Sequence, residues 1–244
     1  MIRKAIPSII TLGNLLCGFL AISADNPTTA FLLIFLGATL DMFDGLAAKL
    51  LKATSLFGKQ LDSLADMVTF GVAPAIAVYH LMEPELSSML IVAMIPIFSA
   101  IRLAWFNILV PDKPGFKGLP TPANGIFFAA LPLLATLDDS KLPLRETLFA
   151  NLPVEQIWLP VTICIFALLM VAPIRMFPLK AILEKGVEQY FVAALFVLVF
   201  PTFLTFGWQV AAPAGVVFYI LLSVVYHLYQ HIKTTGTQPD INPG

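Results

Sequence analysis

The chain has 244 residues, of which 59% are hydrophobic and 12% are charged, and its formal net charge is -1. Soluble domains contain about half apolar and about a quarter charged residues, so this composition excludes an ordinary soluble protein and indicates one built from membrane-spanning segments. There is no surplus of basic residues, and we therefore expect no nucleic-acid partner.

Apolar stretches that approach the roughly 20 residues needed to cross a bilayer recur along the chain and predict an all-α, polytopic transmembrane helical bundle. We expect about eight spans, at residues 6–24, 28–50, 60–81, 86–110, 121–137, 154–173, 188–205 and 209–231. Prolines inside four of them predict kinks: Pro74, Pro96, Pro132 and Pro160. We expect one integral membrane catalytic domain over 1–233 and a disordered polar tail over 234–244.

Basic residues are distributed unevenly between the two sides of these spans. With eight spans both termini lie on one side, and that side holds all of the fourteen basic residues except Lys141 and Arg145. Lys and Arg accumulate in cytoplasmic loops. The sequence therefore predicts an integral cell-membrane protein with both termini, and the loop at 49–59, in the cytoplasm.

The stretch from 41 to 66 places carboxylates where an apolar chain should not have them. Asp41 and Asp44 lie three residues apart near the end of the second span, and Asp62 and Asp66 lie four apart at the start of the third. Each pair shares a helix face, and the loop between the spans brings all four toward one point at the cytoplasmic boundary. A carboxylate inside a span costs about 2.5–3.5 kcal/mol at the bilayer centre and less near its edge.

Four clustered carboxylates repel one another, and too few basic residues lie nearby to neutralise them. A divalent cation is the simplest compensation, so we predict Asp41, Asp44, Asp62 and Asp66 as metal ligands. Oxygen donors without His or Cys suit Mg²⁺ or Mn²⁺, with Ca²⁺ also accommodated, rather than Zn²⁺. Four carboxylates suffice for a two-metal site, the arrangement suited to phosphoryl chemistry. The alternative is helix-end aspartates that simply face water.

Small residues accompany the carboxylates. Gly45 follows Asp44 directly, Ala48 lies one turn further on, and Gly58 lies one turn before Asp62. Their small side chains leave space on both helix faces, so that a ligand can approach the backbone. Lys49, with Lys52 and Lys59 in the same loop region, can offer positive charge to phosphate groups.

Seven residues follow the spacing D-x2-D-G-x2-A-x9-G-x3-D-x3-D: Asp41, Asp44, Gly45, Ala48, Gly58, Asp62 and Asp66. This spacing resembles that of the CDP-alcohol phosphotransferases. The resemblance implies that a CDP-linked lipid or alcohol binds through its diphosphate at the metals. An acceptor hydroxyl then attacks the phosphorus, and CMP leaves.

The resemblance also implies roles for single residues. Asp66 would be the catalytic base, while Gly45, Ala48, Gly58 and Asp62 would line the CDP pocket. The family usually has arginine directly after the alanine, where this chain has Lys49. Lysine keeps the charge but loses the bidentate fork, and we assign Lys49 to the CDP diphosphate.

The first span carries polar residues on one face. Thr11 and Asn14 lie three residues apart, and Gly18 follows one turn later. Polar residues in an apolar span face a cavity or another helix. In the resembling family this helix abuts the cytidine, which implies CDP binding by Thr11 and Asn14. Packing between helices is the alternative.

Three further segments resemble the phosphatidylserine synthase branch of the family: VTFGVAPA after Asp66, RLAWFN from Arg102, and FKGLPTPA from Phe116. This likeness implies CDP-diacylglycerol and L-serine as substrates, phosphatidylserine and CMP as products, a six-helix family core plus two helices, and a homodimer. It covers residues 1–130.

Arg102 lies inside an apolar run, which makes it a functional candidate. It could bind the acceptor carboxylate or a lipid phosphate, or it could snorkel to the interface. We assign Arg102, together with Lys113 and Lys117 of the following loop, to the acceptor or its phosphate.

Two other functions stay open. The same chemistry could use glycerol 3-phosphate or an inositol phosphate, but such acceptors need a cluster of cations, and this chain offers mainly Arg102. A divalent cation transporter would need polar residues that continue across the membrane, whereas the external halves of these spans are nearly all apolar. A purely structural membrane protein leaves the carboxylates unexplained.

Overall fold

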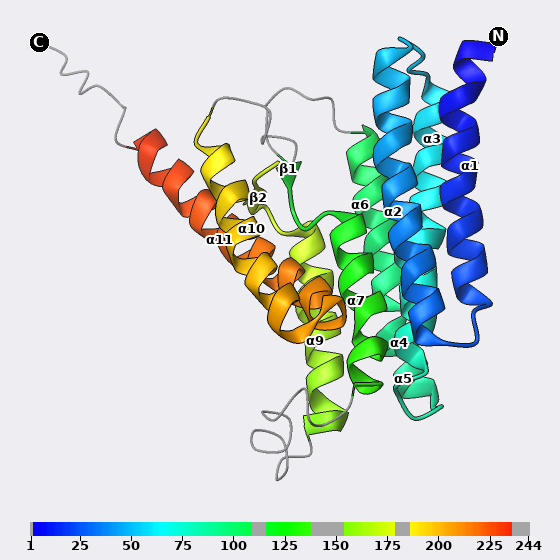
Figure 1. The fold of residues 1–244 in the computed structure, drawn as a ribbon, viewed down its shortest axis with the longest axis vertical. Coiled ribbons are helices and arrows are strands. Elements are labelled where there is room, and N and C mark those ends of the chain that lie inside the picture. The colour runs from blue at the N-terminus through cyan, green and yellow to red at the C-terminus, as the bar shows by residue number, and fades with distance from the viewer. Residues whose placement is uncertain (1, 109–115, 138–153, 179–185, 236–244) are drawn as a thin grey trace, which may run out of the picture.

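The computed structural model describes residues 2–108, 116–137, 154–178 and 186–235. The amino-terminal part contains α1 (Ile2–Ile22), α2 (Pro27–Leu50), α3 (Leu56–Asp66), the π-helix η1 (Met67–Val72), α4 (Ala73–Tyr79), α5 (Leu86–Val92), α6 (Met94–Ile108) and α7 (Thr121–Ala135). The carboxyl-terminal part contains α9 (Val154–Val171), α10 (Glu188–Phe206) and α11 (Trp208–Thr235) (Figure 1).

The prediction of an all-α polytopic bundle is confirmed. Within the described ranges, six helical stretches are long and apolar enough to cross a membrane, and the apolar helices at Thr121–Ala135 and Ile157–Val171 are shorter. Each predicted span corresponds to one of these stretches. α1 begins and α11 ends at the same end of the molecule, as an even number of crossings requires (Figure 1). α11 continues to Thr235, two residues past the predicted end of the domain.

The prolines inside spans have unequal effects. α7 is continuous through Pro132, and α9 is continuous through Pro160. The fourth span, however, is divided into α5 and α6 at Ala93. Pro96 lacks the N–H that would bond to the carbonyl four residues earlier, at Val92, which accounts for an interruption at this point. The third span changes its helical type before Pro74, as described below.

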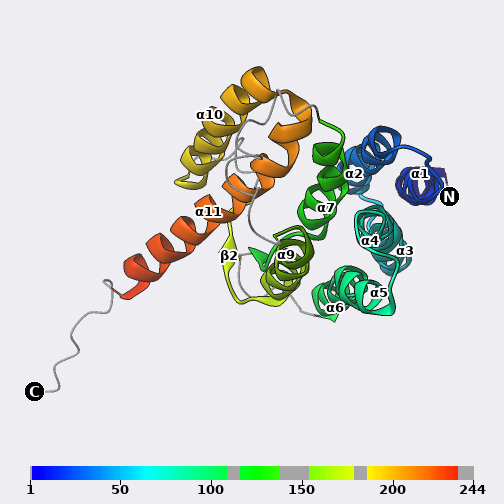
Figure 2. The same cartoon turned by 90° about the horizontal axis from the view of Figure 1, so that it is seen from below.

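α7 is the central helix of the molecule. Figure 2 shows it between the bundle of α1 to α6 on one side and α9, α10 and α11 on the other. Most of its side chains are buried: Phe128 packs against Phe166 of α9, while Leu133 belongs to a second apolar cluster with Ile34 of α2 and Phe70 of η1. α7 therefore joins the two parts of the fold.

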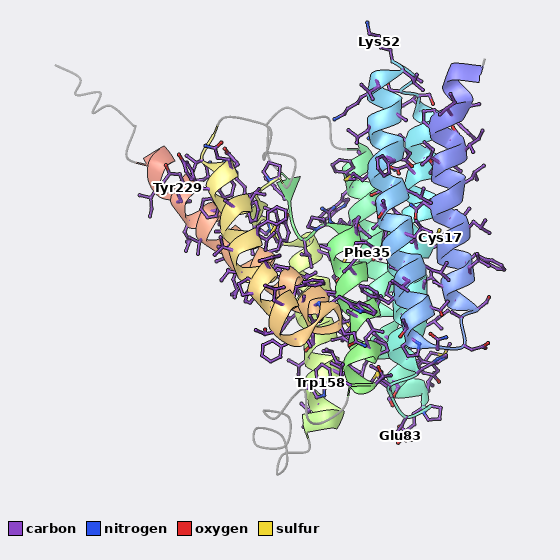
Figure 3. All side chains as sticks on the ribbon, in the orientation of Figure 1. Cys17, Phe35, Lys52, Glu83, Trp158 and Tyr229 are labelled. Carbon is purple, nitrogen blue, oxygen red and sulfur yellow. The ribbon has the colours of Figure 1, made fainter. Side chains whose placement is uncertain are left out.

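Large apolar side chains project from the outer faces of the helices, as a protein surrounded by lipid requires. Phe35 on α2 is one example, and Figure 3 shows many others along α10 and α11. The same view places Lys52 and Glu83 at opposite ends of the helical bundle. These two charged residues thus lie at the ends of the bundle, and apolar side chains cover its outer sides.

A short antiparallel pair fixes the segment that precedes α7. β1 (Phe116–Lys117) pairs with β2 (Arg175–Met176). Gly118 follows with a φ of 76°, where a Cβ would collide with a backbone carbonyl of α9, so this position requires glycine. The amide of Leu119 then donates to the carbonyl of Leu169 at 2.9 Å. The start of α7 is therefore held against the end of α9.

Candidate active site

α2 and α3 form the hairpin predicted from the aspartate spacing, and they bring three carboxylates together. One oxygen from each of Asp41, Asp62 and Asp66 lies within 4.8 Å of the others. Asp66 is buried, and the other two are half-buried. Asp62 Oδ1 is buried with no hydrogen-bond partner among the described residues. Oxygen donors alone, one of them lacking a partner, fit a hard divalent cation.

Asp44, the fourth predicted ligand, lies outside this group of three. Its Oδ2 accepts a hydrogen bond from Thr11 Oγ1 at 2.6 Å, and both side chains are buried. The same hydroxyl lies 3.0 Å from the carbonyl of Pro7. A hydroxyl has only one proton to donate, and the shorter contact to a carboxylate is the stronger of the two. Thr11 thus attaches α1 to the aspartate face of α2.

Asn14 attaches the same helix to Asp66. Its Nδ2 donates to Asp66 Oδ1 at 3.1 Å, and its backbone carbonyl accepts from Thr69 Oγ1 at 2.9 Å. All three residues are buried. Asn14 Oδ1 has no partner in the part of the chain that the structure describes. The two polar residues predicted for CDP binding therefore contact aspartates, and Asn14 orients the Asp66 carboxylate.

A π-helix follows Asp66 directly, which the sequence did not reveal. In η1 the amide of Ala73 bonds to the carbonyl of Val68, five residues back instead of four. Pro74 has no N–H to donate, and in an α-helix its ring would clash with the carbonyl of Phe70. The wider turn removes that conflict. Single π turns occur frequently at functional sites, and this one sets the position of Asp66 relative to the helices around it.

Three glycines on three neighbouring helices admit this wider segment. A Cβ at Gly18 of α1 would lie 2.7 Å from Thr69 Cα, and one at Gly37 of α2 would lie 2.6 Å from Thr69 Cγ2. A Cβ at Gly125 of α7 would lie 2.7 Å from Phe70 Cβ. Real Cβ atoms do not approach so closely, so a side chain at any of these positions would force its neighbours to move. α1 and α7 therefore lie close to the backbone of η1, and α2 lies close to the side chain of Thr69.

The face of α2 beside the carboxylates is open. A Cβ at Gly45 would meet no other atom within 4 Å in the described structure, and Ala48 is half-buried. Lys49 is exposed. On the facing helix, a Cβ at Gly58 would meet only Ser55 Oγ, at 3.1 Å, because that hydroxyl caps α3. The space beside Gly45 is where the resemblance to the family places the CDP pocket.

Arg102 on α6 is buried, with 7% of its surface exposed, so it does not snorkel to the interface. Its Nε donates to the carbonyl of Leu119, just before α7. The Asp66 carboxylate and Tyr219 of α11 both act electrostatically on its guanidinium group. The two loop lysines differ from it: Lys117 is exposed in β1, and Lys113 lies outside the described residues.

Lys59 joins α3 to α6. Its Nζ donates to the carbonyls of Phe106 at 3.3 Å and Asn107 at 3.1 Å, which lie in the last turn of α6. Asn107 Nδ2 in turn donates to Ser63 Oγ of α3 at 2.9 Å. A cation that satisfies the last carbonyls of a helix stabilises its end. We had expected Lys59 to offer its charge to phosphate, but its ammonium group lies on these carbonyls.

Comparison with known proteins agrees with the motif. Residues 4–155 match the sequence profile of the CDP-alcohol phosphatidyltransferases. The chain is 43% identical over 131 residues to the CDP-diacylglycerol–serine O-phosphatidyltransferase of Bacillus subtilis (strain 168), and 41% identical over 128 residues to the protein of that name from Methanocaldococcus jannaschii. It is 30% identical over 236 residues to the protein of the same name from Mycobacterium leprae (strain TN).

These matches differ in how much of each chain they cover. The alignments with the first two relatives include 52% and 51% of this chain, and the third includes 92%. They span 74%, 60% and 73% of the three relatives, respectively. Residues 4–155, which match the family profile, contain the aspartate hairpin, most of α1 and Arg102.

Proposed function

The chain belongs to the CDP-alcohol phosphatidyltransferase family, and from this premise we propose that it transfers the phosphatidyl group of CDP-diacylglycerol to L-serine. The products are phosphatidylserine and CMP. The names of the three relatives support both substrates. The observation that carries the proposal is the convergence of Asp41, Asp62 and Asp66 on a hairpin between apolar spans.

In this proposal the carboxylates hold Mg²⁺ or Mn²⁺. Asp41, Asp62 and Asp66 are the ligands that the geometry favours, and Asp44 completes the set in a two-metal arrangement that Ca²⁺ can also occupy. The unpartnered Asp62 Oδ1 supports this assignment, because a buried carboxylate oxygen needs a cation or a donor. When bound, the cation neutralises charge on the diphosphate and orients the leaving group.

Side chains of the protein remove the proton of the acceptor hydroxyl. Asp66 accepts the proton of the serine hydroxyl while the hydroxyl oxygen forms a bond to the phosphorus attached to diacylglycerol. The bond from that phosphorus to the bridging oxygen breaks, and CMP leaves with its electron pair. Asn14 holds one oxygen of Asp66, which fixes the direction of the other. A base held in this way contributes by its position as much as by its basicity.

The donor and the acceptor occupy opposite sides of the carboxylates. Gly45, Ala48 and Gly58 line the CDP side, where Asp62 and Lys49 also contribute, and the open space beside Gly45 supports this arrangement. Thr11 and Asn14 serve the CDP site by positioning Asp44 and Asp66. On the acceptor side Arg102 binds the serine carboxylate, and Lys113 and Lys117 attract anionic groups to the entrance.

We place the active site at the cytoplasmic face of a cell membrane. α1 begins and α11 ends at the end of the molecule that carries Lys52 (Figures 1 and 3), and the span order assigns most basic residues of the sequence to the same side, which supports a cytoplasmic location by the positive-inside rule. The lipid bilayer surrounds the apolar outer faces. The protein works as a homodimer, by analogy with its family.

The test is the release of CMP from CDP-diacylglycerol by the purified protein, measured against a panel of alcohols. We expect release that depends on L-serine and is accompanied by an equal amount of phosphatidylserine. CMP release that depends instead on glycerol 3-phosphate or an inositol phosphate would show that this alcohol, and not serine, is the acceptor. Uptake of Mn²⁺ into liposomes without any CMP release would indicate a transporter.

A further inference from the structure

The start of α7 carries buried polar atoms that no described residue satisfies. Thr121 is 2% exposed and Asn124 is 1% exposed. Thr121 Oγ1, Asn124 Nδ2 and Asn124 Oδ1 have no hydrogen-bond partner among the described residues. Buried polar atoms nearly always have partners. Three such atoms within one helical turn therefore indicate that a polar ligand binds here.

The packing of α7 against η1 places this turn at the level of Asp66, the proposed catalytic base. Gly125 contacts η1 at Phe70, where a Cβ would lie 2.8 Å from Phe70 Cα. α7 runs in the same direction as the helical stretch from α3 to α4 (Figure 1). Thr121 lies one turn before Gly125, and Asp66 lies one turn before Phe70, so Thr121 and Asp66 are at the same level.

α6 brings a positive charge to the same level. It runs in the opposite direction, and its Ser99 lies beside Gly71 of η1, where a Cβ would be 3.3 Å from Ser99 Cβ. Arg102 follows Ser99 by three residues and therefore lies nearer to Asp66, whose charge acts on the Arg102 guanidinium group. Its Nε donates to the carbonyl of Leu119, two residues before Thr121. Figure 2 shows α6 and α7 on two sides of the α3–α4 stretch.

We propose that Thr121 and Asn124 complete the acceptor subsite with Arg102, and that this subsite is built for the zwitterion of a small α-amino acid. The inference rests on the proposed function. The amino acid's ammonium group donates to Asn124 Oδ1 and Thr121 Oγ1. Its carboxylate accepts from Arg102 and from Asn124 Nδ2. This arrangement leaves its hydroxyl toward Asp66, which takes the proton.

The chemistry of this subsite discriminates between acceptors. Glycerol 3-phosphate has no ammonium group, and its one non-reacting hydroxyl has a single proton to donate, so at least one of Asn124 Oδ1 and Thr121 Oγ1 would be left without a donor. It would also bring a dianion toward the three carboxylates, with Arg102 as the principal counter-charge. A site whose buried polar atoms lose their partners rejects such a ligand strongly. Thr121 and Asn124 are therefore specificity-determining residues for serine.

The test compares two isosteric variants, Asn124→Leu and Thr121→Val, with a matched control, Ser99→Ala. Ser99 is equally buried, but its hydroxyl donates to the carbonyl of Ile95 in its own helix. Each full-length variant is purified in detergent. The measurements are the KM for L-serine, the KM for CDP-diacylglycerol and the thermal midpoint of unfolding.

We expect Asn124→Leu to raise the KM for serine at least tenfold and Thr121→Val at least threefold, with the KM for CDP-diacylglycerol unchanged. The thermal midpoint of Asn124→Leu should equal or exceed that of the wild type, because the substitution removes unpartnered polar atoms. Ser99→Ala should change neither KM. If both variants keep the wild-type KM for serine, or raise both KM values equally, the subsite is refuted. A wild type without serine-dependent CMP release refutes the proposed function as well.

Discussion

The hydrogen bond from Asn14 to Asp66 makes a quantitative prediction for the substitution Asn14→Ala. The variant loses one bond to a buried carboxylate, and bonds to charged groups contribute about 1.5–3 kcal/mol. At about 1.4 kcal/mol for each factor of ten, kcat should fall roughly 10- to 150-fold. Thr69 bonds to the backbone carbonyl of residue 14, which the substitution keeps, so α1 should remain docked on η1.

The assay follows CMP release under saturating CDP-diacylglycerol and varied serine, with thermal unfolding measured in parallel. The matched variant is Thr69→Val, which removes the buried bond to the carbonyl of Asn14 and leaves the bond to Asp66 in place. We expect Asn14→Ala to affect mainly kcat and to change the thermal midpoint little. Thr69→Val should affect mainly the thermal midpoint and change kcat little, because a buried carbonyl left without a donor costs about 1–3 kcal/mol of stability.

Two outcomes would show that the hydrogen bond from Asn14 does not orient Asp66. If kcat of Asn14→Ala stays within twofold of the wild-type value, the hydrogen bond does not orient the base. If kcat is unchanged while the KM for CDP-diacylglycerol rises at least tenfold, Asn14 binds the nucleotide directly, as the sequence alone suggested. In either case the bond at 3.1 Å would be a packing contact only.

The remaining predictions concern the metal, the glycines and the topology. Chelation of divalent cations should abolish CMP release, and added Mg²⁺ or Mn²⁺ should restore it; activity that survives chelation would contradict the carboxylate site. Gly18→Ala should cost about 1–3 kcal/mol of stability by overpacking against Thr69. Gly45→Ala should leave the thermal midpoint unchanged or higher and raise the KM for CDP-diacylglycerol, since its new methyl group meets only the space assigned to CDP. In whole cells, an impermeant thiol reagent should label Glu83→Cys and spare Lys52→Cys, and the opposite pattern would reverse the orientation.

Much of the fold could be predicted from the sequence because membrane spans depend on local composition. Each predicted span matches a helical stretch, and most ends agree within a few residues. The aspartate hairpin could also be predicted from local sequence, since its two pairs of aspartates lie on consecutive helices joined by a short loop. When a short loop forces two consecutive helices to be antiparallel, carboxylates spaced three or four residues apart on each helix can be predicted from the sequence to lie close together.

The parts that could not be predicted depend on tertiary packing. The contacts of Asn14 with Asp66 and of Thr11 with Asp44 form because α1 lies against α2 and α3, which no local pattern specifies. The π-helix η1 depends on a change in hydrogen-bond register. Its signals were Pro74 and the glycines on neighbouring helices, but these became readable only once the helices were assembled.

Other residues were noticed in the sequence, but their environments were not. Lys59 lies in a loop region suited to phosphate, yet its ammonium group binds the end of α6. The segment FKGLPTPA was singled out for its likeness to one branch of the family, but the sequence did not indicate that Thr121 within it and Asn124 just after it have buried side-chain atoms without partners in the described structure. Burial and hydrogen-bond satisfaction are properties of the whole fold, so they had to be observed.

The central claim is that Asp66 accepts a proton from serine at a carboxylate-held metal site. Its most direct test measures CMP and phosphatidylserine formed from CDP-diacylglycerol by the wild type and by Asp66→Asn. The account predicts equal amounts of both products that depend on serine in the wild type, and a loss of at least about 100-fold in the variant. Serine-dependent CMP release that survives in Asp66→Asn would contradict it.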